Sequence, residues 1–272
     1  IVGLFVNGVL TKFIFINIDF RVKRKILKKV GILLIHGLWE HKGRHDVNAS
    51  WFKNLNIEPF LVDLPGHGKN VDVFGHIEQW EEVENSIVEA YKLLASYDVK
   101  IVFGISFGGQ VALHCVLKNI IDPDFLILSA PSLGDNYPQF IKTLSKSISK
   151  LFPKLRIPSS ANKRNLSTDV EVVKDYFNDP LVFRSISAKF GNETIESQKF
   201  VNENISNLKT PTLYLHGDKD SIVPISSGDE LSKLANVKFI TVFNSKHEIL
   251  NQDTRPFVLS EIHQWLVEEK II

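Results

Sequence analysis

Six short apolar runs, separated by segments with helical periodicity, constrain the fold of this chain more than any other feature. Continuous apolar runs of four to six residues are typical of parallel strands that helices cover on both faces. Their alternation with helical segments predicts an α/β fold with a doubly wound, mostly parallel sheet. The strands are expected at 31–35, 59–62, 100–103, 124–128, 211–215 and 237–242, and the helices at 77–96, 107–118, 225–235 and 254–269.

The stretch from 131 to 209 interrupts this alternation, because its sequence is polar or amphipathic and contains no convincing buried strand. It lies between two predicted strands, so we interpret it as an inserted helical cap that divides the sheet domain into 1–130 and 210–272. Ligands bind at the carboxyl ends of the strands in sheets of this type. An insertion after one of these strands is therefore expected to roof the functional site.

The composition is that of an ordinary globular protein, with 44% hydrophobic and 23% charged residues. The formal net charge of +1 gives no reason to expect nucleic acid or any other strongly charged partner. The single cysteine, Cys115, excludes an intrachain disulfide and fits a reducing compartment. We therefore expect a cytoplasmic protein, and leave peripheral contact with membranes open.

Apolar residues dominate the first 20 positions, but Asn7, Lys12 and Asn17 interrupt them before a membrane-spanning length is reached. The Asn7-Gly8 pair between apolar runs favours a β-hairpin, and we expect two strands at a sheet edge. A remnant of a signal or anchor is the alternative. The chain begins with Ile and contains no methionine, so we expect a trimmed start, and a lost leader stays open.

The strongest chemical signal is Gly104-Ile105-Ser106-Phe107-Gly108, which follows a predicted strand and opens a helical pattern. This is the context that a nucleophile elbow requires, because the serine must project from a sharp strand-to-helix turn. The flanking glycines leave room where the turn brings backbone segments together. We therefore predict that Ser106 is a catalytic nucleophile.

A serine hydroxyl needs a base, and in folds with this elbow the acid and then the histidine follow the serine along the chain. Asp220 lies in a loop after the strand run 211–215, and His247 lies in the loop after 237–242. We predict that His247 is the general base and that Asp220 orients it. Asp218 is the competing acid, but it is nearer the strand and more suited to holding the turn.

Acyl transfer also needs hydrogen-bond donors for the oxyanion. One donor is expected to be the backbone N–H of Phe107, and the other the N–H of Leu38 in the loop after the first core strand. The preceding His36-Gly37 pair gives that loop the glycine it needs to turn inward. Zinc motifs and a phosphate-binding loop are absent from the sequence, so we expect neither a metal nor a cofactor.

The chain resembles the monoacylglycerol lipase and lysophospholipase branch of the α/β-hydrolases, which include the serine aminopeptidase S33-like enzymes. The matching stretches are His36-Gly-Leu-Trp-Glu-His41, Asp63-Leu-Pro-Gly-His-Gly-Lys69, 104–109, Leu128-Ser-Ala-Pro131, Leu166-Ser-Thr-Asp169, Asp179-Pro-Leu-Val182 and His247-Glu-Ile-Leu-Asn251. The resemblance implies an α/β-hydrolase fold and hydrolysis of single-chain lipid esters through an acyl-enzyme. It also supports the roles predicted for Ser106, Asp220, His247, Leu38 and Phe107.

The chain departs from this branch beside the nucleophile, where Ile105 and Phe107 replace the usual His and Met, and at Trp39, where a small residue is usual. We expect His36, Gly37 and Trp39 to border the substrate, with Trp39 narrowing the mouth of the site. A short-chain carboxylesterase and an S33-type peptidase are alternatives on the same scaffold. A ligand-binding module with slow turnover is a third reading, against which the complete set of catalytic residues argues.

Within the predicted cap, residues 136–168 contain seven basic and no acidic residues. Lys142, Lys146 and Lys150 are spaced so that they share one face of a helix, and apolar residues can form the other face. A basic amphipathic helix is typical of contact with a membrane surface. The alternative is a lid that packs its apolar side on the site and leaves its lysines in water.

Overall fold

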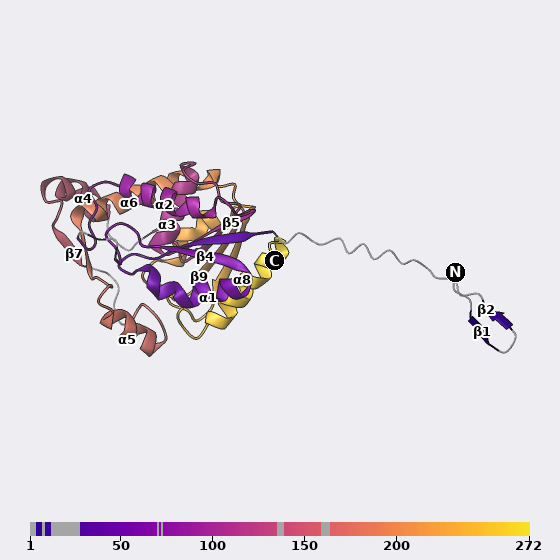
Figure 1. Ribbon diagram of the computed structural model, residues 1–272. Helices are drawn as coiled ribbons and strands as arrows, with labels where there is room; N and C mark the ends of the chain where they lie inside the picture. The colour runs from indigo at the N-terminus through magenta and orange to yellow at the C-terminus, as the bar shows by residue number, and fades with distance from the viewer. Residues whose placement is uncertain are drawn as a thin grey trace.

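A computed structural model describes residues 4–6, 9–11, 28–69, 71, 73–134, 139–158 and 164–272 (Figure 1). The predicted turn at Asn7-Gly8, the side chain of Lys142 and all of Lys163 lie outside the described residues. The predicted α/β architecture is confirmed, because a six-stranded parallel sheet with helices on both faces forms the body of the protein.

The sheet has the strand order β10-β9-β6-β5-β3-β4, and all of its neighbouring strands pair in parallel. Each of the six predicted strands corresponds to one of these strands, and its predicted ends differ from the observed ends by at most two residues. The bounds are β3 Val30–Ile35, β4 Ile57–Val62, β5 Val99–Ile105, β6 Phe125–Ser129, β9 Thr212–Gly217 and β10 Val237–Val242.

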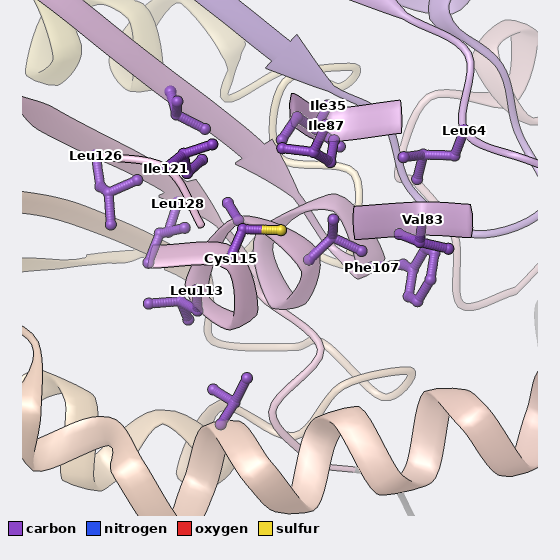
Figure 2. Close-up of a cluster of buried hydrophobic side chains, with 14 of the residues drawn as sticks. Ile35, Leu64, Val83, Ile87, Phe107, Leu113, Cys115, Ile121, Leu126 and Leu128 are labelled. Atoms are coloured by element: carbon purple, nitrogen blue, oxygen red, sulfur yellow. The ribbon is translucent and has the colours of Figure 1, made fainter. Parts of the chain in front are cut away.

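Alternate residues of β3 supply two hydrophobic clusters on opposite faces of the sheet. Leu33 and Ile35 pack on the face covered by α2 (Glu81–Tyr91), α3 (Phe107–Leu117) and α6 (Ala188–Asn204). Figure 2 shows part of this cluster, which includes Phe107 and Cys115 of α3 together with Ile35 and Leu128 of the sheet.

The other face of the sheet is covered by α1 (Asp46–Asn54) and α8 (Arg255–Glu268). Ile32 and Leu34 of β3 pack on this face, against Phe52 of α1 and Trp265 of α8. A fully buried aliphatic side chain stabilises a fold by about 1.5–3 kcal/mol relative to leaving it exposed. The alternation of buried side chains between the two faces therefore fixes the orientation of each strand in the sheet.

The strand order reverses between β3 and β5, because the chain passes from β3 outward to β4 and then returns to the other side of β3. Crevices open outside the carboxyl ends of parallel strands at such a reversal. The loop that begins at His36 leaves β3 here, and Ser106 follows β5 directly. The topology thus brings two predicted parts of the site together.

Between β6 and β9 the chain forms α4 (Gln139–Leu151), β7 (Arg156–Pro158), α5 (Val170–Asn178), β8 (Ser185–Ser187) and α6. β7 and β8 pair antiparallel in a small sheet of their own. The sequence did not predict them, because three residues are too few to show a period. Phe190 and Val201 of α6 are fully buried against the main core. The division into core parts 1–130 and 210–272 with a cap at 131–209 stays a prediction.

Smaller differences from the sequence-based expectations lie at the chain start and at two helices. β1 (Leu4–Val6) and β2 (Val9–Thr11) pair antiparallel, and within the described part of the chain they form a two-stranded sheet of their own, so the expected placement at the edge of a larger sheet was wrong. The pairing satisfies the backbone groups with which the two strands face each other.

The helix expected at 77–96 is shorter, with α2 followed by a 3₁₀ turn at Lys92–Leu94. The helix expected at 225–235 is a 3₁₀ turn at Ile225–Gly228 followed by the single turn α7 (Asp229–Ser232). Helix ends commonly tighten into 3₁₀ geometry, which sequence periodicity does not reveal. Among the described residues, no helix has the length and apolar character needed to cross a bilayer.

Candidate active site

Ser106 occupies a strained turn between β5 and α3, with φ +51° and ψ −115°. A non-glycine residue adopts this conformation only where the surrounding structure enforces it. Glycines on either side permit the turn: a Cβ atom at Gly104 would collide with the backbone of Gly108 and Gly109, and one at Gly108 with the carbonyl oxygen of Ile35. The Gly-x-Ser-x-Gly spacing therefore places the hydroxyl of Ser106 at the carboxyl edge of the sheet.

A continuous chain of hydrogen bonds joins the three predicted catalytic side chains, which come from the ends of three different strands. The hydroxyl of Ser106 donates to Nε2 of His247 over 2.8 Å. On the other side of the ring, Nδ1–H of His247 donates to Oδ2 of Asp220 over 2.6 Å. These distances allow proton transfer from the serine to the histidine without rearrangement.

Asp220 is held in one orientation by its own loop. Its Oδ1 accepts the backbone N–H groups of Ile222 and Val223 at 2.9 and 3.0 Å. Asp218, the competing acid, instead accepts the backbone N–H of Ser245 over 3.1 Å. The structure therefore brings Asp220, and not Asp218, to the imidazole of His247.

The electrostatics of the pair favour an ionised acid beside a basic histidine. Burial alone would raise the pKa of Asp220, but His247 and the neighbouring His216 hold it far below its usual value. Burial alone would lower the pKa of His247, yet the charge of Asp220 and their hydrogen bond raise it above the ordinary 6.5. The imidazole can therefore accept a proton from Ser106 and keep it as a stabilised cation.

The loop after β3 is anchored by a buried carboxylate. Oε1 of Glu40 accepts the N–H of Gly37 over 2.6 Å and is also bonded to the ring of His45. Its other oxygen pairs with Arg44, whose guanidinium makes two 2.8 Å bonds to Glu248, the neighbour of His247. One arginine thus ties the loop that carries the predicted oxyanion donor to the loop that carries the base.

His36 lies beneath this loop and does not line either cavity described below. Its Nδ1–H donates to the carbonyl of Gly37 over 2.7 Å, and its Nε2 accepts the N–H of Leu64 over 3.0 Å. Burial lowers the pKa of His36 to about 4, so the ring is neutral. These contacts favour a role in holding the loop, and the predicted contact of His36 with substrate stays untested.

Two cavities meet at Ser106. The larger has a volume of about 180 Å³ and is mainly apolar, with walls from α3 and from the segment between β6 and β9. The smaller has a volume of about 50 Å³ and borders Glu40, His45 and Glu248 as well as His247. Both are lined by Leu38, Trp39, Ser106 and Ile222. Ser106 thus faces an apolar chamber on one side and a more polar recess on the other.

The predicted oxyanion donors lie together at this junction. Leu38 and Phe107 both line the larger cavity beside Ser106. Phe107 is the first residue of α3, and the first N–H groups of a helix have no acceptor within the helix. Phe107 is 1% exposed, and its ring packs on Trp80 and Phe190 in the core. The role of its backbone N–H as an oxyanion donor stays a prediction.

Trp39 lines both cavities and has the positive φ of +69° that a bulky residue rarely adopts. Its carbonyl oxygen accepts the N–H of Phe183 over 3.2 Å, which ties this loop to the segment between β6 and β9. Gly37 lines the smaller cavity. Of the three residues predicted to border the substrate, Gly37 and Trp39 are thus placed at a cavity wall.

Sequence reasoning missed two sets of supporting residues. The first is Glu40, Arg44 and Glu248, of which only the Glu40–Arg44 spacing of four residues is visible in the sequence. The second is Tyr214 and His216, which lie two residues apart on one face of β9, ahead of the loop that carries Asp220. Alternation along a strand could have indicated the second set. Within the part of the chain that the structure describes, no group of three or more His, Cys, Asp or Glu residues could hold a metal ion.

The chain is similar to several proteins that are named as lipases or phospholipases. It is 25% identical over 249 residues to a monoacylglycerol lipase of Mycolicibacterium smegmatis, with 87% of each chain covered. It is 28% identical over 200 residues to a phospholipase of Bacillus subtilis, with 71% of this chain and 76% of the relative covered.

Solved structures show the same architecture. A monoacylglycerol lipase of Paleococcus ferrophilus superposes with a TM-score of 0.80 at 26% identity, covering 88% of this chain and 94% of the other. A monoglyceride lipase of Saccharomyces cerevisiae, at 18% identity and a TM-score of 0.77, covers 89% and 87% and shares the fold. The profile of the serine aminopeptidase S33 family (Hydrolase_4) matches residues 28–254. The chain therefore belongs to this family of α/β-hydrolases.

Proposed function

We propose that this protein is a serine hydrolase that cleaves esters of single-chain lipids, with monoacylglycerols as the first candidates. The observation that carries the proposal is the hydrogen-bonded chain from Ser106 through His247 to Asp220, which opens into an apolar cavity of about 180 Å³. The similarity to enzymes named monoacylglycerol lipase supports the same substrate class.

The arrangement supports a two-step acyl transfer. His247 takes the proton of Ser106 while Oγ attacks the ester carbonyl, and Asp220 stabilises the imidazolium that results. The N–H groups of Leu38 and Phe107 hold the oxyanion of the tetrahedral intermediate. His247 then returns the proton to the leaving alcohol, and water releases the fatty acid by the same sequence of steps.

The two cavities suggest how a substrate is divided at Ser106. The larger, apolar cavity suits the acyl chain, because burial of methylene groups stabilises the complex by about 0.8 kcal/mol each. The smaller cavity suits the alcohol part. It is lined by Glu40 and Glu248. Both carboxylates pair with the same cation, Arg44, so two negative charges share one positive charge. This excess of negative charge favours neutral glycerol over the phosphate of a lysophospholipid.

We further infer that α4 and the turn after it contact a lipid surface. Lys146, Lys150, Lys154 and Arg156 are exposed there. Large apolar side chains accompany them with unusual exposure: Leu144 at 50%, Leu151 at 73%, Phe152 at 63% and Leu155 at 52%. Basic residues attract anionic lipids while apolar ones insert between them. Ser145 and Ile157 of the same segment line the larger cavity, so a docked surface would lie close to its opening.

The test is fatty-acid release from monoacylglycerols and lysophospholipids of graded chain length, with a short p-nitrophenyl ester and Ser106→Ala alongside. We expect rapid, Ser106-dependent release from long-chain monoacylglycerols and slower release from lysophospholipids. Activity confined to the short ester would instead indicate a general carboxylesterase. Peptide cleavage in the absence of lipid hydrolysis would indicate an aminopeptidase.

A further inference from the structure

A second histidine contacts the catalytic acid. His216 lies on β9, and its Nε2 is 3.2 Å from Oδ2 of Asp220, the same oxygen that accepts from His247. Its other ring nitrogen, Nδ1, is 2.6 Å from the hydroxyl of Tyr214. The side chains of His216 and Asp220 are fully buried, and Tyr214 is fully buried as well. Neither Tyr214 nor His216 lines the two cavities at Ser106.

The proton positions in this chain follow from its acceptors. Nε2 of His216 faces both Oδ2 of Asp220 and, at 3.0 Å, the carbonyl oxygen of Val223. An ionised carboxylate and a carbonyl can only accept, so Nε2 must carry the proton. In the neutral ring Nδ1 is then an acceptor, and Tyr214 donates to it. Burial and the nearby carboxylates raise the pKa of Tyr214, which keeps its phenol protonated for this purpose.

Packing around Tyr214 holds its hydroxyl in place and so defines the direction of its hydrogen bond to His216. A Cβ atom at Gly228 would collide with the hydroxyl of Tyr214, so the ring packs directly on the backbone of the 3₁₀ turn. On its other side the ring of Tyr214 lies against Phe239, with centroids 4.7 Å apart. A donor held this closely fixes the orientation of the His216 ring in turn.

We propose that Tyr214 and His216 are positioning residues for the acid, and that they act on catalysis through Asp220. With His216 in place, Asp220 accepts four hydrogen bonds: two backbone N–H groups at Oδ1 and two imidazole N–H groups at Oδ2. All of its usual lone-pair sites are thereby occupied. The carboxylate cannot rotate without losing bonds, so it holds the His247 ring at Ser106.

This proposal rests on the proposed Ser106-dependent ester hydrolysis and adds two residues that touch neither substrate nor nucleophile. The test compares His216→Leu, His216→Gln and Tyr214→Phe with the wild type, on the short p-nitrophenyl ester. The control is His114→Leu, which removes another buried histidine, one that is bonded to Trp80, Glu84 and Ser197 and not to the catalytic residues.

We expect His216→Leu to lower kcat about 10- to 100-fold with little change in KM, since it removes a hydrogen bond to a charged group. Gln can donate to Asp220, so His216→Gln should stay within about threefold of the wild type, and Tyr214→Phe should fall between the two. His114→Leu should lower the melting temperature without lowering kcat. A kcat of His216→Leu equal to that of the wild type would overturn the proposal, as would equal loss in the Leu and Gln variants.

A second readout separates positioning from general stability. The Nδ1–H proton of His247, bonded to Asp220, should give a low-field proton NMR signal in Ser106→Ala protein. The signal should shift or broaden on adding His216→Leu, and persist on adding His216→Gln or His114→Leu. A signal unchanged by His216→Leu would contradict the proposal.

This readout needs no turnover, so it decides the role of His216 even if the proposed lipid activity fails. If the Leu variant does not fold, Tyr214→Phe provides the same comparison, because it removes one hydroxyl and keeps the ring. A fully active Tyr214→Phe enzyme with an unchanged signal would then overturn the role proposed for Tyr214.

Discussion

The two sides of Ser106 are built differently. On the side of the strand ends, hydrogen bonds hold both the acid and the base: Asp220 accepts four, and the ring of His247 bonds to Asp220 and Ser106. On the other side, the segment between β6 and β9 contributes Ile157, Ile186 and Ile195 to the larger cavity, whose surface is mainly apolar. Directional bonds define the first side and packing defines the second.

This difference indicates where chemistry and selectivity reside. Hydrogen bonds with fixed directions tolerate little displacement, so the strand side is suited to one reaction. Apolar walls can change shape at a modest energetic cost when volume is conserved. We therefore expect substitutions on the strand side to reduce turnover of every ester, and substitutions on the other side to change which esters are cleaved.

The largest effect is expected for Asp220→Asn, which should lower kcat by about 10⁴-fold while leaving the geometry intact. Because Asp220 raises the pKa of His247, the wild-type rate should fall with acidification through a pKa above 6.5. Without that charge the pKa of His247 drops, and the acid limb of the pH–rate profile should move to lower pH. Asp218→Asn is the control and should keep both the rate and the profile near those of the wild type.

The next largest effect is expected when Glu40, which anchors the loop after β3, loses its charge. Glu40→Gln keeps the size of the side chain but removes the charge that Arg44 and the N–H of Gly37 contact. We expect kcat to fall about 10- to 100-fold on all esters, since a hydrogen bond to a charged group is worth roughly 1.5–3 kcal/mol. Glu58→Gln on the exposed edge of β4 should have no effect. Equal loss in both variants would point to a general effect on folding.

A selective effect is expected in the apolar chamber. Gly191 lines the larger cavity, and a Cβ atom there would meet Ile186 and Ile157 at ordinary contact distances of 3.5 and 3.6 Å. Gly191→Leu should therefore fill the chamber without straining the backbone. We expect kcat/KM to fall about 10-fold or more for long acyl chains, with the short ester unaffected. Gly191→Ala is the matched control, and uniform loss across chain lengths would break the division between the two sides.

The smallest effect on turnover is expected for the exposed lysines of α4. Lys146→Glu with Lys150→Glu should weaken co-sedimentation with anionic vesicles by about 30-fold, because each of the two basic residues near such a surface contributes about 1 kcal/mol. Hydrolysis of the short ester should not change. Lys53→Glu on α1, under the opposite face of the sheet, serves as the control. Equal vesicle binding by both variants would show that α4 does not contact lipid.

The same contrast explains how far the sequence predicts the structure. The elbow at Ser106 and the strand before it follow from local patterns, since the glycine spacing and the apolar run lie within ten residues of each other. Arg44 and Glu248 are 204 residues apart, and nothing in either local sequence indicates their pairing. The short strands β7 and β8 and the positive φ of Trp39 depend on tertiary contacts for the same reason.

The central claim, that esters are cleaved through a covalent intermediate on Ser106, is tested most directly by active-site labelling. Wild-type protein is treated with a fluorophosphonate, with and without a long-chain monoacylglycerol, and the modified peptide is located by mass spectrometry. We predict a single adduct on Ser106, slowed by the monoacylglycerol and absent from Ser106→Ala. An adduct on another residue, or labelling of Ser106 that the lipid does not slow, would contradict the account.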